Sequence, residues 1–488
     1  MLVDARRLPA GRAFDCDVCV VGAGAAGIAL ALELAGARLR VVLLESGGFE
    51  REEATQDLYR GRIFGRSYPP LDALRSRWFG GTTNAWLGRL RPLDASDFEA
   101  REWLPHSGWP ISAQELEPFL GRAGRTCGLE DVASDAAGAP ADPPLPLDPA
   151  VIETRELRIA PSRFGERYRE AVTHAANLDT FLHANAVELV ANQAGSALSG
   201  VRVAALGGSS FPVRARCVVL AAGGIENPRL LLASNRVQKA GLGNGADLVG
   251  RFFMEHPQLA AGALLPASAD LPLGLYRART LGRGQSVALL TPSAALLRRE
   301  RIQSFAALVA GEAALPELER SLAQSVHELE AAAGAPAPRA LFLLNTCEQA
   351  PNPASRVRLV EERDALGLPR VQLEWRLSPS DLHGLRRGHE LLARELGRAG
   401  IGRLQLMFGP DDMDWPADLG GSGHQMGTTR MHSDPRQGVV DASCRVHGVA
   451  NLYVAGSSVF PTCGAADPTL TIVALAIRLA DHLKREFV

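Results

Sequence analysis

Three glycines near the N-terminus have the spacing of a phosphate-binding turn. Gly22, Gly24 and Gly27 form the pattern G-x-G-x-x-G between an apolar stretch at 17–22, which predicts a buried strand, and an Ala- and Leu-rich stretch at 25–35, which predicts a helix. The first glycine permits a tight turn, the second lets the backbone approach a pyrophosphate, and the third permits close packing of helix on strand. Free N–H groups at the helix N-terminus attract phosphate charge. The pattern therefore predicts a dinucleotide site.

Glu45 supports the prediction of a dinucleotide site. A second apolar stretch at 39–44 predicts a strand, so the segment has the pattern of a βαβ unit, and Glu45 follows that strand directly. A carboxylate about 20 residues after the glycines accepts hydrogen bonds from ribose hydroxyls. The same charge repels the 2′-phosphate of NADP, which leaves NAD and FAD as the candidate cofactors.

His424 and Asp467 are the candidate acid–base residues. His424 lies in the sequence GSGHQMG, where glycines leave its imidazole accessible, and an imidazole titrates near neutral pH. Oxidation of an alcohol requires removal of the hydroxyl proton, which suits such a base, although a single histidine also fits a structural role. Asp467 precedes Pro468 and a long apolar stretch at 469–486, which predicts an N-capping aspartate with the proline as first helical residue.

Four segments resemble the glucose–methanol–choline (GMC) family of FAD-dependent oxidoreductases. They are GGTTNAWLGRLRP at 80–92, LAAGGIENPRLLLAS at 220–234, GRFFMEHP at 250–257 and the C-terminal run at 424–483, which is the most specific. This run is most similar to the branch of pyranose oxidases and sugar dehydrogenases. The resemblance implies an FAD enzyme that oxidises a CH–OH group of a sugar-like substrate (a pyranose, glycoside, polyol or aminoglycoside) to the carbonyl.

By this resemblance, the loop that begins at Gly80 packs along the flavin near its N5 edge. In some relatives a histidine just before the tryptophan of this loop carries the flavin covalently. Here Ala85 stands before Trp86, so the resemblance implies non-covalent FAD. The full set of implied cofactor-binding residues is Gly22, Gly24, Ala25, Ala26, Gly27, Glu45, Ser46, Gly80, Gly81, Thr82, Asn84, Ala85, Trp86, Val187, Ala222, Gly223, Gly456, Ser457, Pro468 and Thr469.

The resemblance also assigns the catalytic residues. It makes His424 the base facing flavin N5, the atom that accepts hydride. Asp467 stands where the family usually has asparagine, and sometimes histidine, paired with the catalytic histidine. A carboxylate there favours the imidazolium, so we expect it to raise the pKa of His424. The helix that Pro468 and Thr469 begin points its positive end at the flavin pyrimidine, where negative charge develops.

The patterns along the chain predict an α/β protein, α+β overall, with a Rossmann-like FAD-binding domain. We expect this domain to be discontinuous, built from residues 1–256 and 421–488. Its polar and Pro/Gly-rich stretches predict loop excursions at 50–110 and 133–150.

Residues 257–420 are expected to form a substrate-binding domain. Alternating stretches such as VALLTP, ALFLLNT, RVRLV and VQLEW predict a mainly antiparallel sheet, flanked by helices at about 315–333 and 379–398. Glu348 and Arg356 are candidates either for contact with a polar substrate or for a surface ion pair.

Composition argues against several other classes of protein. The 488 residues include 52 basic and 54 acidic side chains, a net charge of −2 that argues against a nucleic-acid partner. The seven cysteines are few and scattered, which is not typical of a disulfide framework, and no metal-ligand spacing is present. No apolar run reaches the roughly 18 residues of a membrane span, and no secretion signal is visible. The sequence predicts a cytoplasmic protein, and its preference for Arg over Lys is typical of a GC-rich bacterial genome.

Three other functions stay open at this stage. They are a lyase on the same fold, a flavoprotein that works only with a partner, and an ordinary NAD dehydrogenase. For the leading prediction, the electron acceptor is oxygen, a quinone or a redox protein, and both an oxidase and a dehydrogenase fit the sequence.

Overall fold

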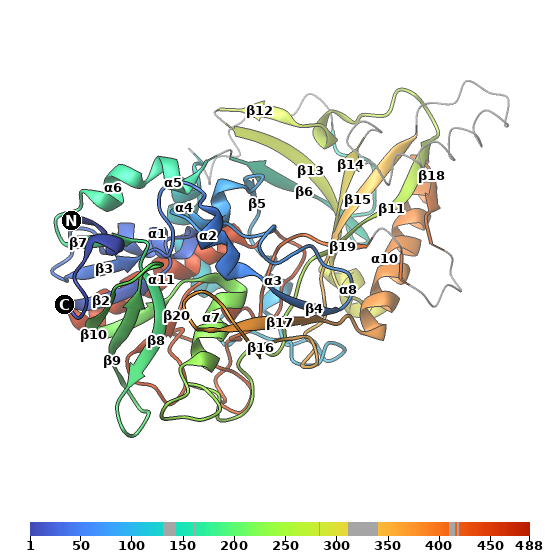
Figure 1. Cartoon of the computed structure of the whole chain (residues 1–488). Helices are drawn as coiled ribbons and strands as arrows, with labels where there is room; N and C mark the ends of the chain where they lie inside the picture. The colour runs from blue at the N-terminus through green and yellow to red at the C-terminus, as the bar shows by residue number, and fades with distance from the viewer. Residues whose placement is uncertain (130–142, 161, 283, 311–339, 409–414, 417–418) are drawn as a thin grey trace.

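Two large β-sheets organise the protein (Figure 1). The computed structural model describes residues 1–129, 143–160, 162–282, 284–310, 340–408, 415–416 and 419–488. One sheet lies on the side of the molecule that holds both chain termini, and the second lies on the opposite side (Figure 1). Helices accompany both sheets, which confirms the mixed α/β class.

The predicted βαβ unit is present in the first sheet. Strands β2 (Phe14–Val21) and β3 (Val41–Leu44) pair in parallel, and helix α1 (Ala25–Leu34) connects them. The last four residues of β2 and all of β3 are buried and apolar, as expected for parallel strands covered on both faces.

The first sheet has eight strands in the order β1-β7-β3-β2-β10-β9-β8, with β20 also paired to β10. The pairs that join β1, β7, β3, β2, β10 and β20 are parallel, whereas β8, β9 and β10 form an antiparallel meander. The other strands are β1 (Leu2–Asp4), β7 (Leu178–Leu182), β8 (Asn185–Ala191), β9 (Leu198–Ala204), β10 (Ser210–Leu220) and β20 (Leu452–Val454).

Three helices pack together beside the first sheet. They are α1, α4 (Ala113–Cys127) and the C-terminal α11 (Thr469–Phe487). The buried face of α11 includes Leu470, Val473, Ala474 and Ile477, whose spacing keeps them on one side of a helix. A further helix, α7 (Gly223–Ala233), follows β10 and contacts β8.

The second sheet has nine strands and is antiparallel, as predicted. Its main order is β18-β11-β15-β14-β13-β6-β5, and helix α10 (Pro379–Arg398), at the predicted position, contacts β18. The strands are β5 (Arg89–Leu90), β6 (Ile152–Ile159), β11 (Pro257–Pro266), β12 (Arg279–Leu281), β13 (Gly284–Pro292), β14 (Phe305–Ala310), β15 (Leu341–Cys347), β18 (Gly402–Leu406) and β19 (Gly420–Gly421).

Two predicted strands belong to a different sheet. The stretches RVRLV and VQLEW form β16 (Arg356–Arg363) and β17 (Pro369–Trp375), which join β4 (Gly61–Gly65) in a separate three-stranded sheet. The segment 50–110, expected to be loops, therefore contributes a strand that pairs in parallel with β17. Helix 315–333 and most of the excursion at 133–150 lie outside the described residues, and the domain boundaries stay a prediction.

The remaining helical segments are short. Among the described residues, no helix is both long and apolar enough to cross a membrane. The short segments are η1 (Ala5–Arg7), α2 (Glu53–Gln56), η2 (Asp57–Tyr59), η3 (Gly81–Asn84), α3 (Ala95–Phe98), α5 (Phe164–Arg167), α6 (Arg169–Thr173), η4 (Gly274–Tyr276), α8 (Ala294–Glu300) and η6 (Ser457–Val459).

Candidate active site

A cavity of about 620 Å³ lies where the parallel strands of the first sheet end. Its wall includes residues at or just after the carboxyl ends of β2, β3, β10 and β20, the usual ligand position in α/β sheets. Every residue predicted to bind cofactor or to act in catalysis lines this wall except Gly27, Gly80 and Asn84.

The three glycines of the turn are needed for different reasons. A Cβ on Gly27 would lie 1.8 Å from the Gly22 carbonyl oxygen, and one on Gly22 would lie 2.7 Å from the Ala221 oxygen, so packing demands both glycines. A Cβ on Gly24 would meet only the Cα of Gly81, at 3.9 Å, so this side faces open space. Since Gly24 caps α1 without a side-chain hydrogen bond, the helix N-terminus can receive phosphate oxygens.

Glu45 holds the turn from the end of β3. Its carboxylate accepts hydrogen bonds from the backbone N–H groups of Ala23 and Gly47, each at 2.9 Å. The side chain is almost fully buried yet lines the cavity, so its oxygens lie beside any ribose placed there.

The loop that follows Gly80 forms another part of the wall. Gly80 has φ +101°, and the turn η3 leads from it to Ala85 and Trp86, which both line the cavity. Asn84 does not line the cavity, but it donates to the Phe79 carbonyl oxygen at 3.0 Å and so stabilises the conformation of this loop. The methyl side chain of Ala85 offers no atom for a covalent flavin bond.

His424 lies in a loop that is held in place by the buried carboxylate of Glu255. Glu255 accepts hydrogen bonds from the backbone N–H of His424 at 3.0 Å and from the Ser422 hydroxyl at 2.9 Å. The hydroxyl of Tyr68 donates to the other oxygen of Glu255. Burial, and after it the positive charge of Arg89, lower the pKa of His424 to about 4, so the imidazole is neutral at pH 7.

A second histidine fixes the tautomer of His424. The Nδ1 atoms of His256 and His424 lie 2.9 Å apart, and His256 Nε2 lies 3.3 Å from the Cys463 carbonyl oxygen. That carbonyl can only accept, so His256 Nε2 carries the proton and, with its pKa also lowered to about 4, His256 Nδ1 is an acceptor. His424 therefore donates from Nδ1, which leaves Nε2 as an unprotonated nitrogen.

His256 is not among the site residues that the sequence predicts, although it lies in the segment 250–257. The antiparallel bridge between Met254 and Met426 brings the two histidines opposite each other, because each lies two residues from its methionine. Nothing local to either segment indicates that pairing. Two further histidines contact each other outside the cavity wall: His447 Nε2 lies 2.8 Å from the His432 carbonyl oxygen.

Asp467 lies beside the free nitrogen of His424, at 3.6 Å from Asp467 Oδ1 to His424 Nε2. Two expectations for this residue are wrong. Pro468, not Asp467, is the N-cap of α11, which begins at Thr469 and has no side-chain cap. The pKa of His424 is lowered rather than raised, because burial and then the charge of Arg89 disfavour the imidazolium.

Glu348 and Arg356, the two candidates from the middle region, do not line this cavity. Glu348 is buried and binds Arg101 with both carboxylate oxygens, so it is a buried rather than a surface pair. Arg356 pairs with the exposed Asp247 at 3.1 Å, so of the two expectations for this arginine the ion pair is the one observed, although Arg356 itself is buried.

The cavity fits FAD. Its volume lies within the range of small-molecule sites. The open side of Gly24, the uncapped helix N-terminus and the buried Glu45 match a pyrophosphate and a ribose. A dinucleotide cavity whose wall includes a neutral histidine is typical of a flavin-dependent oxidoreductase.

Comparison with known families agrees with this class. A family model described as "FAD dependent oxidoreductase" matches residues 17–238, and one described as "GMC oxidoreductase" matches residues 351–476. The two matches agree with the resemblance to the GMC oxidoreductases, and FAD is the cofactor.

Full-length relatives carry names of the same class. The chain is 25% identical to 2-methyl-1,2-propanediol dehydrogenase of Mycolicibacterium austroafricanum, over 96% of this chain and 95% of that protein. It is 26% identical to paromamine 6'-oxidase of Streptomyces fradiae, over 97% of this chain and 92% of that protein. The crystal structure of pyridoxine 4-oxidase from Mesorbium loti shares the fold, with a TM-score of 0.56 and 20% identity over 96% of this chain and 99% of that one.

Proposed function

We propose that the protein oxidises a CH–OH group of a polar, sugar-like substrate to the carbonyl, using FAD. The observation that carries the proposal is the state of His424. It is the histidine of the cavity wall, it is neutral, and its hydrogen bonds leave one ring nitrogen free to accept a proton.

The residues of the chain account for the movement of the proton. His424 Nε2 takes the proton of the substrate hydroxyl, and the carboxylate of Asp467 at 3.6 Å stabilises the imidazolium that forms. His256 accepts from His424 Nδ1 throughout, so the ring does not reorient. When bound, FAD supplies the hydride acceptor for the carbon of the same substrate. The carbon loses hydride and the oxygen loses a proton, which gives the carbonyl.

The relatives support the substrate class. Paromamine and a diol stand in the names of two full-length relatives, and C-glycoside 3-oxidase of Microbacterium trichothecenolyticum is 39% identical over 25% of this chain. We propose a pyranose, glycoside, polyol or aminoglycoside as substrate, and oxygen, a quinone or a redox protein as electron acceptor.

A cytoplasmic location in a bacterium also belongs to this proposal. All seven cysteines are free and buried, which fits a reducing compartment. The two full-length relatives come from Mycolicibacterium and Streptomyces.

The test is the visible spectrum of the purified yellow protein, mixed without oxygen with sugars, glycosides, aminoglycosides and simple alcohols. The proposal predicts that one of these classes bleaches the flavin band. Admission of air, and then addition of a quinone, identifies the acceptor. A protein that binds FAD and that none of these alcohols bleaches contradicts the proposal and favours a lyase or a partner-dependent flavoprotein.

A further inference from the structure

One cation in the cavity wall has no counterion. Arg89 lines the same cavity as His424 and Asp467, and it is half-buried. Within the described part of the chain, its guanidinium has no hydrogen-bond or ion-pair partner, and no carboxylate oxygen lies within 4.0 Å of it. A half-buried charge without a partner is unfavourable, so this side chain is available to a ligand.

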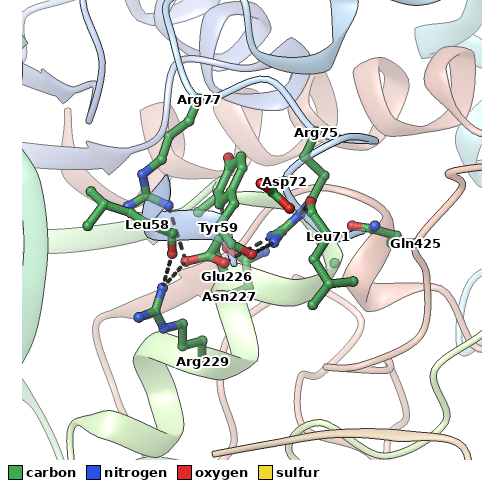
Figure 2. Close-up of polar contacts among 12 residues, drawn as sticks. Leu58, Tyr59, Leu71, Asp72, Arg75, Arg77, Glu226, Asn227, Arg229 and Gln425 are labelled. Atoms are coloured by element: carbon green, nitrogen blue, oxygen red, sulfur yellow. Dashed lines mark hydrogen bonds and ion pairs between the residues drawn. The ribbon is translucent and has the colours of Figure 1, made fainter. Parts of the chain in front are cut away.

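Each of the other three arginines of the wall has a carboxylate partner. Figure 2 shows Arg75, Arg77 and Arg229 converging on Glu226, at 2.9, 3.3 and 3.1 Å from its carboxylate. Arg229 also contacts Asp364 at 2.6 Å. Arg89 is therefore distinct among the arginines of the described cavity wall.

The backbone of Arg89 is held firmly. Strand β5 pairs with β6 at the edge of the nine-stranded sheet, and Leu90 is buried beside it. A Cβ on Gly88 would lie 2.1 Å from the Ala160 carbonyl oxygen, so the chain fits tightly just before the arginine. The base of the side chain is thus pre-positioned, which reduces the entropy lost when it binds a ligand.

Arg89 also lies near His424 in the cavity wall. Its charge lowers the pKa of His424, whereas Asp467 faces His424 Nε2 and does not pair with Arg89. A ligand that contacts Arg89 is therefore close to the base. The planar guanidinium forms two parallel hydrogen bonds with an oxyanion such as a carboxylate or a phosphate.

We propose that Arg89 binds an oxyanion substituent of the substrate, so that the preferred substrates are sugar-like alcohols bearing a carboxylate, such as uronic or aldonic acids. This inference rests on the proposed function for its substrate class. A phosphate ester could form the same pair of hydrogen bonds with the guanidinium, so phosphorylated sugars are tested separately.

The first experiment compares matched acid and neutral substrates on the FAD-loaded enzyme. We expect kcat/KM for methyl glucuronoside to exceed that for methyl glucopyranoside by about tenfold to a hundredfold, the range of charge-assisted hydrogen bonds. Arg89→Gln removes this preference and Arg89→Lys retains part of it. Arg7→Gln, at an exposed arginine outside the cavity wall, leaves the ratio unchanged. Glucose 6-phosphate replaces the acid in the phosphate arm.

A second experiment measures binding without turnover. Tetrahydropyran-2-carboxylate and its carboxamide have no hydroxyl to oxidise, and their binding is followed by the change in the flavin spectrum. We expect the acid to bind at least tenfold more tightly than the amide, and Arg89→Gln to abolish the difference. Inorganic phosphate serves as the competing oxyanion.

The two experiments separate this inference from the proposed function. One outcome is that neutral sugars bleach the flavin, that acids have no higher kcat/KM, and that Arg89→Gln changes neither the acid-to-neutral ratio of kcat/KM nor the acid-to-amide ratio of affinity. This outcome refutes the oxyanion site and leaves the proposed oxidoreductase activity intact. If no alcohol bleaches the flavin but the carboxylate binds through Arg89, the proposed oxidation fails and the site survives. Loss of FAD from both Arg89→Gln and Arg89→Lys assigns the arginine to the cofactor and overturns the inference.

Discussion

At the scale of residues, removal of the substrate proton depends on one ring nitrogen, His424 Nε2. The hydrogen bonds from Cys463 through His256 to His424 allow a single proton arrangement, in which His424 Nε2 is the base. With the pKa of His424 near 4, the base is ready across the neutral range. Activity is therefore expected to be constant through neutral pH and to fall as the pH approaches 4 and the imidazole becomes protonated.

Substitution of His256 tests the tautomer. In His256→Leu, His424 loses its acceptor at Nδ1 and can carry its proton on Nε2 instead, so kcat should fall on the order of a hundredfold with little change in KM. His256→Asn offers an amide oxygen to His424 Nδ1 and should recover part of the rate. FAD content reports any general damage. Equal rates for the leucine and asparagine variants would contradict the positioning role.

Substitution of Asp467 tests its charge. The carboxylate favours the protonated form of His424, so Asp467→Asn should lower the pKa of His424 further and move the acid limb of the rate profile to lower pH. The weaker base should also reduce the rate of flavin bleaching, by about tenfold. The measurement is the pH profile of anaerobic bleaching. A profile identical to that of the wild type would show that the charge of Asp467 plays no part.

At the scale of elements, the glycines of the β2–α1 turn have different roles: Gly27 is required for packing, and Gly24 for the approach of the phosphate. Gly27→Ala places a Cβ 1.8 Å from the Gly22 oxygen and should destabilise the fold by about 1–3 kcal/mol, with or without FAD. Gly24→Ala meets no close atom in the protein, so the apoprotein should melt as the wild type does while FAD binds at least tenfold more weakly. Thermal melting and FAD titration measure both effects.

Gly208→Ala is the matched control for the two glycine variants, since its Cβ meets nothing within 4 Å and its φ is unstrained. It should change neither melting nor FAD affinity. An apoprotein of Gly24→Ala that melts as early as that of Gly27→Ala would contradict a separate role for Gly24 in phosphate binding.

The same scale shows what the sequence can and cannot predict. Local sequence patterns predict the β2–α1–β3 unit and α10, because the residues that set the periodicity and the ends of these elements lie within the elements themselves. The pairing of β17 with β4, and of His256 with His424 at a separation of 168 residues, depends on contacts between distant segments. Arg89 carried no signal either, since its importance lies in the absence of a counterion in the folded wall.

At the scale of the whole molecule, a buried ion pair joins two segments that are 247 residues apart in the sequence. Arg101 follows α3, while Glu348 follows β15 of the nine-stranded sheet, and both side chains are buried. Burial alone would raise the pKa of Glu348, but the pKa is lowered because the charge and hydrogen bonds of Arg101, together with the Ser304 N–H and His256, outweigh burial. The carboxylate also accepts from the Ser304 N–H at 3.0 Å.

Breaking this pair from one side should be costly. Arg101→Met leaves Glu348 charged and unpaired in the interior, and should lower the free energy of unfolding by about 3–5 kcal/mol. The double variant Arg101→Met with Glu348→Leu should recover most of the loss, because no buried charge is left. Denaturant unfolding of the FAD-bound protein measures both. A double variant less stable than the single one would contradict this explanation.

The central claim is that His424 removes the hydroxyl proton while the substrate carbon gives up hydride. The most direct measurement is the rate of anaerobic flavin bleaching for the wild type and for His424→Asn, with a substrate deuterated at the reacting carbon. The account predicts a yellow His424→Asn variant that bleaches at least a hundredfold more slowly than the wild type, and a wild-type rate that deuterium slows. A His424→Asn variant that binds FAD and bleaches as fast as the wild type would contradict the account.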